Sequence, residues 1–454
     1  MPCEVGCIRL SGVVTLVRGT TYKSALLGRE GPVLLGLASI QRDGGFRGDS
    51  LKTYGGDSPQ KLLMYPGDLY VSLKDVTQSG DLLGSVARVP RSVQLGRLTQ
   101  DTVKLVPTLL DYPRDLLYWS LRAPQYRAYC RERAIGTTNL SLSRDDFLAF
   151  QLPAPAEARL ELVRLLEGLE HRIDLLRQTN TTIESIAQAL FKSWFVDFDP
   201  VRAKAEGREP EGMDTETAAL FPSEFEESEL GTIPKGWSMR PFGALLASAI
   251  GGDWGSDERD EEHDQPVTVI RGTDMPDIRA GKYDGVPRRF VGHKKLAKRA
   301  LVDGDIVIEV SGGSKTQPTG RSLYLTSELL TRLGGSVVPT SFCRLFRAPD
   351  AHTGLLLARH LSSIYAAGKT WNYQVQSTGL SNFQTQHFLS AELVTCPPPA
   401  VRAAFFEIVR PLVNRRHSAP IEELEQVRDT LLPRLISGKL RITEAMEQVE
   451  EALT

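Results

Sequence analysis

The chain has 454 residues, a formal net charge of −2, and ordinary fractions of hydrophobic (41%) and charged (24%) residues. This length suits two or three globular domains. No apolar run reaches the ~20 residues that a membrane span needs, and Met1–Leu10 lacks a secretory pattern. These features exclude membrane-spanning and secreted classes and predict a cytoplasmic protein without a membrane partner.

The cysteines and histidines give no sign of a metal site. Five cysteines are scattered along the chain, and neither a CxxC motif nor a histidine cluster is present. We therefore predict reduced, mostly buried thiols and no bound metal.

The small net charge conceals a strong asymmetry along the chain. Residues 196–231 contain eleven acidic and three basic residues, so their charge is −8 and the remainder carries +6. Within residues 271–321, eleven basic residues face six acidic ones. Such a basic region suits a phosphate backbone, although a solvated surface is the alternative.

The first part of the chain, residues 1–155, predicts a small α/β domain. The apolar runs Val33–Ile40 and Lys61–Leu73 are typical of strands, and Gly67 and Asp68 form a turn before the LYVSL strand. A short helix is expected within Asp111–Arg133, and the PAP sequence that follows ends the domain.

The next segment, residues 156–198, predicts one long helix. Its seam residues follow a heptad spacing of alternating fours and threes. They are Leu162, Leu166, Leu169, Ile173, Leu176, Asn180, Ile183, Ala187, Leu190 and Trp194. Asn180 is the single polar member and marks the register. From Leu162 to Trp194 the helix spans about 50 Å, which is too long for burial in one domain.

An acidic linker, residues 199–234, leads to a second domain, residues 235–399, which repeats the first. Its runs Val267–Met275 and Lys295–Val310 follow the same order as those of the first half. Gly304-Asp305 lies 237 residues after Gly67-Asp68, and Phe388 lies 241 residues after Phe147. A helix is expected within Thr353–Tyr365.

A second long helix is predicted over residues 400–441, followed by a C-terminal tail, 442–454. Its apolar stripe comprises Phe406, Val409 and Val413, and resumes at Leu424 after a break at 418–420. The fold class is therefore α+β. Two small α/β domains are separated by two long helices that form an antiparallel coiled coil, with a pseudo-twofold internal repeat.

Three stretches carry a family resemblance. The phrase ALFKSWFVDFDP, the acidic linker ending in GTIPKGW, and the closing LLPRLISGKL are long and specific. With the domain layout, they resemble the DNA-specificity subunit of bacterial type I restriction-modification systems over nearly the whole chain. This resemblance implies a non-catalytic subunit with two target-recognition domains. Each domain reads half of an asymmetric bipartite DNA site, and the helices set the gap between the halves.

The resemblance also implies the partners. These are double-stranded DNA, a modification subunit that is usually present in two copies, and a restriction and translocase subunit. S-adenosylmethionine, ATP and Mg are expected on those partners, and no cofactor on this chain. A proposed docking surface for the modification subunit is the apolar helix end Phe191, Trp194, Phe195, Leu432 and Leu435. The alternative is a cap formed by the linker's own Phe198, Leu220 and Phe221.

Candidate DNA contacts follow from side-chain chemistry near predicted strand ends, since Arg and Lys suit guanine and phosphate, and Asn and Gln suit adenine. In the first domain they are Arg42, Arg47, Lys52, Lys74, Thr77, Gln78 and Arg88. In the second domain Arg288, Arg289, Lys294 and Lys295 suit phosphate, and Lys315, Thr316, Gln317, Arg321, Lys369, Asn372 and Gln374 lie in loops. Surface solvation is the alternative for each.

Two other function classes are alternatives to this interpretation. A lone DNA-modifying enzyme would need a cofactor loop and a catalytic constellation. SGGSKT at Ser311–Thr316 resembles a Walker A loop only faintly, because the first glycine of that motif is missing and Ser314 stands where the glycine before the lysine is required. No adenine methyltransferase signature is present. A coiled-coil adaptor without DNA contact would explain the helices but not the duplicated basic domains.

Overall fold

The computed structural model describes residues 7–437 except for Asp43, Ser50, 77–78, 109–110, Thr138, 229–230, Lys315 and 378–379. The chain divides into two compact units, Met1–Ile173 with Glu423–Thr454, and Asp174–Glu422. Helices α5 (Glu157–Phe195) and α14 (Ile421–Ser437) each contribute residues to both units. The predicted tail, 442–454, lies outside the described residues.

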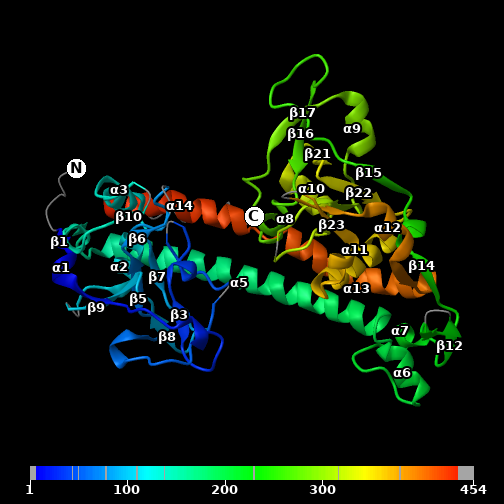
Figure 1. The fold of residues 1–454 in the computed structure, drawn as a ribbon, viewed down its shortest axis with the longest axis horizontal. Coiled ribbons are helices and arrows are strands. Elements are labelled where there is room, and N and C mark those ends of the chain that lie inside the picture. Colours follow the sequence, from blue (N-terminus) through cyan, green and yellow to red (C-terminus); the bar gives the residue numbers. More distant parts are fainter. Residues whose placement is uncertain are drawn as a thin grey trace. The chain divides into compact units, whose positions relative to one another are not determined.

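The first unit is built around an antiparallel sheet whose strand order is β2-β9-β5-β7 (Figure 1). These strands are β2 (Val14–Arg18), β9 (Thr102–Pro107), β5 (Leu69–Ser72) and β7 (Val86–Arg88). All of β5 is buried, because its apolar residues lie in the middle of the sheet. This strand is the predicted LYVSL strand, so that prediction is confirmed.

A smaller sheet and several short elements complete the first unit. The sheet has the order β3-β8-β4, with β3 parallel and β4 antiparallel to β8. The remaining strands are β3 (Val33–Leu35), β8 (Gly96–Leu98), β4 (Leu63–Met64), β1 (Ile8–Arg9), β11 (Gln151–Leu152), β6 (Lys74–Asp75) and β10 (Leu140–Ser141). The helices are α1 (Leu10–Val13), α2 (Arg114–Ser120), α3 (Pro124–Glu132) and α4 (Arg144–Leu148). The helix expected within 111–133 is therefore two short helices.

The second unit contains a sheet of the same design, β15-β22-β18-β20, with every neighbouring pair antiparallel. A second sheet has the order β17-β16-β21, and a third has the order β19-β24-β23. The strands are β14 (Ser238–Pro241), β15 (Ser248–Gly251), β16 (Gln265–Ile270), β17 (Arg288–Val291), β18 (Ile306–Glu309), β19 (Ser311–Gly312), β20 (Ser322–Tyr324), β21 (Ser336–Pro339), β22 (Cys343–Arg347), β23 (Gln374–Ser377), β24 (Leu380–Phe383) and β25 (Leu393–Cys396). The helices are α8 (Met275–Arg279), α9 (His293–Arg299), α10 (Ser327–Leu333), α11 (Ala351–Ala366), α12 (Thr385–Ala391) and α13 (Pro399–His417).

The internal repeat predicted from the sequence extends to strand order and direction. β2, β9, β5 and β7 of the first unit correspond to β15, β22, β18 and β20 of the second, in the same chain order. The β1–β11 pair likewise corresponds to the antiparallel pair β14–β25. Two features differ among the described strands. β4 pairs with β8 whereas β17 pairs with β16, and the second unit has a three-stranded β19-β24-β23 sheet where the first unit has only the two-stranded β10-β6 sheet. The two copies therefore share the order of the four-stranded sheet but differ in the smaller sheets.

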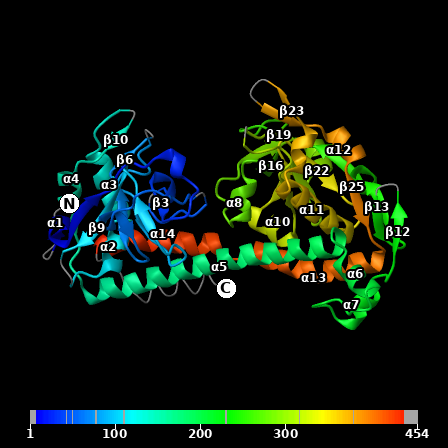
Figure 2. The same ribbon diagram turned by 60° about the horizontal axis from the view of Figure 1, so that its bottom comes forward.

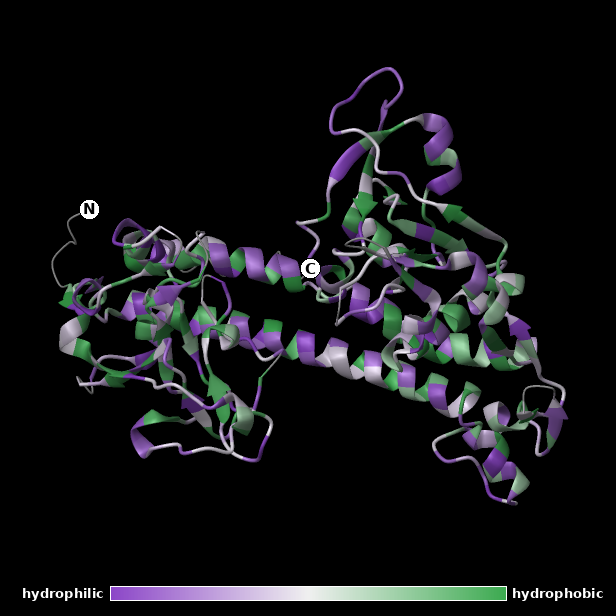
Figure 3. Cartoon of the chain, in the orientation of Figure 1, coloured by the Kyte–Doolittle hydropathy of each residue, from purple (hydrophilic) through white to green (hydrophobic). Residues whose placement is uncertain are grey.

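Helix α5 shows the predicted apolar seam. Every seam residue from Leu162 to Trp194 is buried except Leu190, which is half-buried and packs against the core. Polar and apolar residues alternate along this helix (Figure 3). In the first unit, Arg159 of α5 donates to the carbonyl of Leu435 in α14. In the second unit, the register residue Asn180 is 7% exposed, and its Nδ2 lies 3.5 Å from the Arg416 carbonyl of α13.

The second long helix is interrupted, as the sequence predicted. Helix α13 ends at His417 and α14 begins at Ile421, so the break falls at residues 418–420. The buried apolar stripe of α13 includes Phe405 in place of the predicted Phe406. Phe405 is buried at 1% exposure, whereas the predicted Phe406 is half-buried and packs on the His352 ring.

The acidic segment 199–234 is folded rather than extended. It contains α6 (Asp199–Ala205), α7 (Thr215–Ala219) and the antiparallel hairpin β12 (Phe225–Ser228) and β13 (Gly231–Pro234) (Figure 2). Phe198 precedes α6 with a positive φ of 57°, the left-handed backbone that ends one helix and allows the next to start in a new direction. This segment brings its own apolar residues back to the helix that it follows.

Two further observations concern membrane spans and thiols. None of the helices that the structure describes is long and apolar enough to cross a membrane. Cys130, Cys343 and Cys396 are free thiols. Cys7 is disulfide-bonded, so the prediction of uniformly reduced thiols is wrong at that position.

Candidate nucleic-acid interface

Four of the basic side chains that the sequence proposes as DNA contacts in the first unit lie at the surface. Arg42, Arg47, Lys52 and Lys74 are exposed. Three of them have only loose or exposed acidic neighbours: Asp81 at 3.8 Å for Arg42, Asp49 at 3.1 Å for Arg47, and Asp101 at 3.7 Å for Lys74. Surface pairs of this kind contribute little and can be exchanged for phosphate. Thr77 and Gln78 lie outside the described residues.

Helix α9 and the strand before it carry the basic surface of the second unit. Arg288, Lys294 and Lys295 are exposed, and Lys295 pairs with Asp253 at 2.9 Å. Lys298 is also exposed on α9 and was missed as a candidate, although the run HKKLAKR signals it. Figure 1 shows α9 lying next to the β16–β17 sheet.

The loop candidates of the second unit fall into three groups. Thr316 and Asn372 are exposed, and Gln317 is half-buried. Gln374 is engaged by the chain itself, because its Oε1 accepts from the Thr319 amide at 3.0 Å and hydroxyl at 3.1 Å. Lys315 lies outside the described residues.

Four predicted contacts, Arg88, Arg289, Arg321 and Lys369, have acidic partners within the chain, and DNA contact at these residues stays a prediction. Arg88 makes two bonds to Glu167, at 3.0 and 2.5 Å, and lies over the Tyr118 ring at 4.0 Å. Arg321 forms a fork to Glu309, a carboxylate that is 2% exposed.

The other two residues also have acidic partners within the chain. Arg289 is 8% exposed, pairs with Asp257, and stacks on Trp254 at 4.1 Å. Lys369 pairs with the fully buried Glu392 at 2.8 Å. Glu392 is also bonded by His360 and Tyr373, whereas the Asp257 side chain that pairs with Arg289 is 82% exposed.

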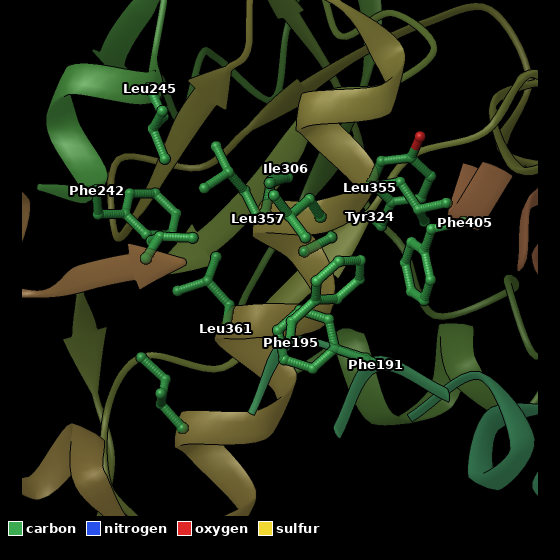
Figure 4. Close-up of a cluster of buried hydrophobic side chains, with 14 of the residues drawn as sticks. Phe191, Phe195, Phe242, Leu245, Ile306, Tyr324, Leu355, Leu357, Leu361 and Phe405 are labelled. Carbon is green, nitrogen blue, oxygen red and sulfur yellow. The ribbon is translucent and has the colours of Figure 1, made fainter. Parts of the chain in front are cut away.

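The prediction of a docking surface at the helix ends is wrong. Phe191, Trp194 and Phe195 are 1%, 4% and 3% exposed, and they belong to the core of the second unit. Figure 4 shows Phe191 and Phe195 directed toward Phe405 and the α11 leucines. Leu432 and Leu435 are 6% and 0% exposed in the first unit. Buried side chains cannot form a docking surface.

The segment that follows the helix supplies part of the cover, as the alternative interpretation expected. Phe221 packs edge-on against Trp194 with ring centroids 5.0 Å apart, and Phe198 packs against Trp237 at 5.9 Å. Leu220 remains 37% exposed. The rest of the cover comes from α11 and α13, which the sequence alone did not place there.

Two glutamates of α5 fasten this helix to its surroundings. In the first unit, Glu170 bridges Arg122 at 3.0 Å and Arg428 of α14 at 2.8 Å. In the second unit, Glu184 bridges Arg359 of α11 and Arg416 of α13, each at 2.8 Å. We call these the Glu170 bridge and the Glu184 bridge. In each unit, one carboxylate of α5 thus links this helix to an arginine of the domain and to an arginine of a C-terminal helix.

The bridges shift the titration of both carboxyl groups. Burial alone would raise the pKa of Glu170, but Arg122 and Arg428 overcome it and lower the pKa to about 2. Burial opposes ionisation of Glu184 in the same way, and Arg359 and Arg416 lower its pKa to about 2. Both bridges are therefore charged at neutral pH.

Comparison with known proteins points to one family. No family model matches the chain. The chain is 25% identical over 367 residues to the type I restriction enzyme HindI specificity subunit of Haemophilus influenzae, covering 72% of this chain and 76% of the relative. It is 22% identical over 346 residues to the MjaIX specificity subunit of Methanocaldococcus jannaschii, covering 73% and 70%. The crystal structure of a type I S subunit from M. genitalium shares its fold, with a TM-score of 0.54, 13% identity, and 95% of each chain covered.

Proposed function

We propose that this chain, a relative of type I restriction enzyme specificity subunits, is the non-catalytic DNA-binding subunit of such a system. It recognises an asymmetric bipartite target and directs a methyltransferase and restriction complex to it. Similarity to two specificity subunits over more than two thirds of each sequence supports this proposal. The predicted alternatives, a lone modifying enzyme and an adaptor, have no comparable support.

One structural observation carries the proposal, namely the repeated sheet topology with different surfaces. The same four-stranded order occurs in both units, but the exposed basic side chains sit on different elements. In the first unit they lie in the loops around Arg42 and Lys52 and on β6, and in the second on β17 and α9. Two domains of one fold and unlike surfaces would read two unlike half-sites, since base-edge contacts specify sequence.

The helices serve in this proposal as a spacer of fixed length. Half-sites read from one face of B-DNA lie about one helical turn, or ~34 Å, apart. A stiff connection is needed to keep that spacing. The buried seam of α5, Asn180 and the two glutamate bridges supply stiffness within each unit. We propose that the two helices thereby set the number of unspecified bases.

The proposed partners are double-stranded DNA, a modification subunit in two copies, and a restriction and translocase subunit. S-adenosylmethionine, ATP and Mg belong to those partners. Because the predicted aromatic surface is buried, the modification subunit would instead contact the outer faces of the helices. Exposed apolar residues remain there: Leu175 and Ile186 on α5 and Ile408 on α13.

DNA binding by the complex with a modification subunit tests the proposal. A protein that neutralises phosphates loses affinity as salt rises, with a slope of about −0.9 per phosphate contact. We expect Lys294→Gln with Lys298→Gln to reduce that slope by about 2. The matched control is Lys23→Gln with Lys61→Gln, two exposed lysines outside the proposed contacts. Binding that is absent or insensitive to salt, or equal slopes for both double variants, would contradict the proposal.

A further inference from the structure

The β19-β24-β23 sheet of the second unit carries a row of three side chains across its strands. Asn382 of β24 lies opposite Ser311 of β19 on one side and opposite Val375 of β23 on the other. Residues directly opposite each other in neighbouring antiparallel strands have their side chains on the same face of the sheet. These three residues therefore lie side by side on one face, and we call them the second-unit row.

The first unit has a matching row in a shorter form. Ser141 of β10 lies opposite Lys74 of β6, and an isolated antiparallel bridge places Ile135 opposite Ser141. This bridge stands where the second unit has β23. The matching members of the two rows are 237, 241 and 240 residues apart, which is the offset of the internal repeat. The first-unit row and the second-unit row are thus two copies of one element; β6 and β10, and β19 and β23, can be followed in Figure 2.

Both rows are open to solvent. Ile135 is 61% exposed and Val375 is 50% exposed, although apolar β-branched side chains favour burial. Lys74 and Asn382 are exposed as well, and the two serines beside them are half-buried. One exposed apolar residue needs no explanation. The same exposed position in two diverged copies of a domain indicates a shared role.

The segments around Ile135 and Val375 contain no charged residue. Residues 134–142 and 370–386 have none, in a chain with 24% charged residues overall. Eleven of the seventeen residues 370–386 are Asn, Gln, Ser or Thr. Amides and hydroxyls form hydrogen bonds with base edges, whereas phosphate contacts rely mainly on basic side chains. This composition suits the base edges of a DNA groove.

The polar members of the two rows differ in the bases that they suit. In the second unit, Ser311 Oγ donates to Asn382 Oδ1 at 2.9 Å and so orients the amide, whose oxygen can accept a second hydrogen bond. An oriented amide matches the donor and acceptor pair of adenine. In the first unit, Lys74 stands at the position of Ser311 and has only a loose ion pair with Asp101, at 3.7 Å. An ammonium group suits the two acceptors of guanine.

We propose that the two rows contact the base edges of the two half-sites in the major groove, an inference that rests on the proposed function. The major groove admits a two-stranded β-ribbon, and an apolar side chain there contacts the methyl group of thymine. Asn382 accordingly binds an adenine and Val375 a thymine methyl group in one half-site. Lys74 binds a guanine and Ile135 a thymine methyl group in the other. Strands lie about 4.8 Å apart, so each row spans about 10 Å, close to three base pairs.

Uracil-substituted DNA tests the thymine contacts without a change to the protein, because uracil lacks only the 5-methyl group. The target is first mapped by methylation. The complex of the full chain with the modification subunit is then titrated with duplexes in which one thymine at a time is replaced. We expect about fourfold weaker binding at one position in each half-site. No weaker binding at any position, or a half-site without an A·T pair, would overturn the thymine assignment.

Variants assign each row to its half-site. Asn382→Ala should lower the preference for adenine at one position about tenfold and leave the other half-site unchanged. Lys74→Ala should lower the preference for guanine at one position of that other half-site. Gln386→Ala, which removes an exposed amide on α12 outside the row, is the control and should change neither half-site. If Lys74→Ala weakens binding equally on all sequences, this lysine contacts phosphate and its assignment is wrong.

A fourth variant keeps the test separate from folding and from the proposed function. Val375→Ala should abolish the uracil effect in one half-site and keep it in the other, with an unfolding midpoint close to wild type because this side chain is exposed. If the wild-type complex binds its target with strong salt dependence but these variants keep every base preference, the rows do not contact bases and the proposed function still stands. Absent or salt-insensitive binding by the wild-type complex would instead overturn both.

Discussion

Glu170 and Glu184 lie two heptads apart on α5, and each is held by two arginines from different elements. A carboxylate shared by two guanidinium groups is partly dehydrated, so its contribution to the stability of the fold depends on both partners remaining in place. Arg122 and Arg359 are both buried, and they would be left unpaired if the carboxylate were lost. The bridges therefore act as fixed attachment points for α5 within each unit.

The first prediction concerns the Glu170 bridge. Replacing Glu170 with Gln keeps the shape but removes the charge that Arg122 and Arg428 share, so we expect a loss of about 3 kcal/mol in unfolding free energy. Glu161→Gln on the exposed side of the same helix is the control and should change stability by less than about 0.5 kcal/mol. Urea unfolding measures both. Similar losses for the two variants would show that the bridge has no special role.

The second prediction concerns acid. The pKa of Glu170 in the folded protein is about 2, below its ordinary value of 4.5. A carboxyl group with a depressed pKa stabilises the fold above its unfolded value, and this contribution is lost as pH falls toward the folded value. The stability difference between wild type and Glu170→Gln should therefore shrink as pH falls from about 4.5 toward 2. Urea midpoints measured between pH 6 and pH 3 check this, and a constant difference would contradict the charge-based explanation.

At the scale of elements, the end of α5 is a core component rather than a surface. Phe191, Trp194 and Phe195 all pack on Phe405 of α13, with ring centroids 4.9 to 6.3 Å apart. Phe221 from the acidic segment covers Trp194 from another direction. One helix end thus collects apolar side chains from three separate parts of the chain.

The third prediction tests this packing. Phe405→Ala removes the ring that the three α5 aromatics share, so we expect a loss of about 3–5 kcal/mol in unfolding free energy. Ile408→Ala on the same helix is the matched control, because Ile408 is 41% exposed and its truncation should cost less than about 1 kcal/mol. Thermal or urea unfolding compares them. An equal cost for both variants would contradict the central place of Phe405.

The elements differ in how far the sequence could predict them. The α5 seam, the break at 418–420 and the strand at Leu69 follow local periodicity and turn chemistry, and all were predicted. The burial of Phe191 and Phe195 was not, because it depends on α11 and the acidic segment returning to the helix. The ion pairs of Arg88 and Arg321 were not predicted for the same reason, since their partners Glu167 and Glu309 lie 79 and 12 residues away.

At the scale of the whole molecule, the repeated topology explains why one chain would serve an asymmetric target. Duplication gives both units the same sheet, and divergence leaves them with different exposed side chains. The order of the repeat was visible in the sequence, whereas the divergent β4 and β17 pairings were not. Under the proposed function, the half-sites depend on each unit separately, and the gap depends only on the helices that run through both.

The last prediction tests whether the length of the helices sets the gap between the half-sites without changing the half-sites themselves. Seven residues inserted after Ile173 in α5, with seven matched residues after Glu422 in α14, add one heptad to each helix where the two units meet in sequence. One heptad preserves the phase of the seam and lengthens a helix by about 10 Å, close to three base pairs. We therefore expect both half-sites to stay unchanged and the gap to grow by about three bases. Methylation mapping in cells that also produce the modification subunit measures this, with a variant carrying seven residues in the exposed loop near Arg208 as the control. An altered half-site with an unchanged gap would mean that the recognition domains, and not the helices, set the spacing.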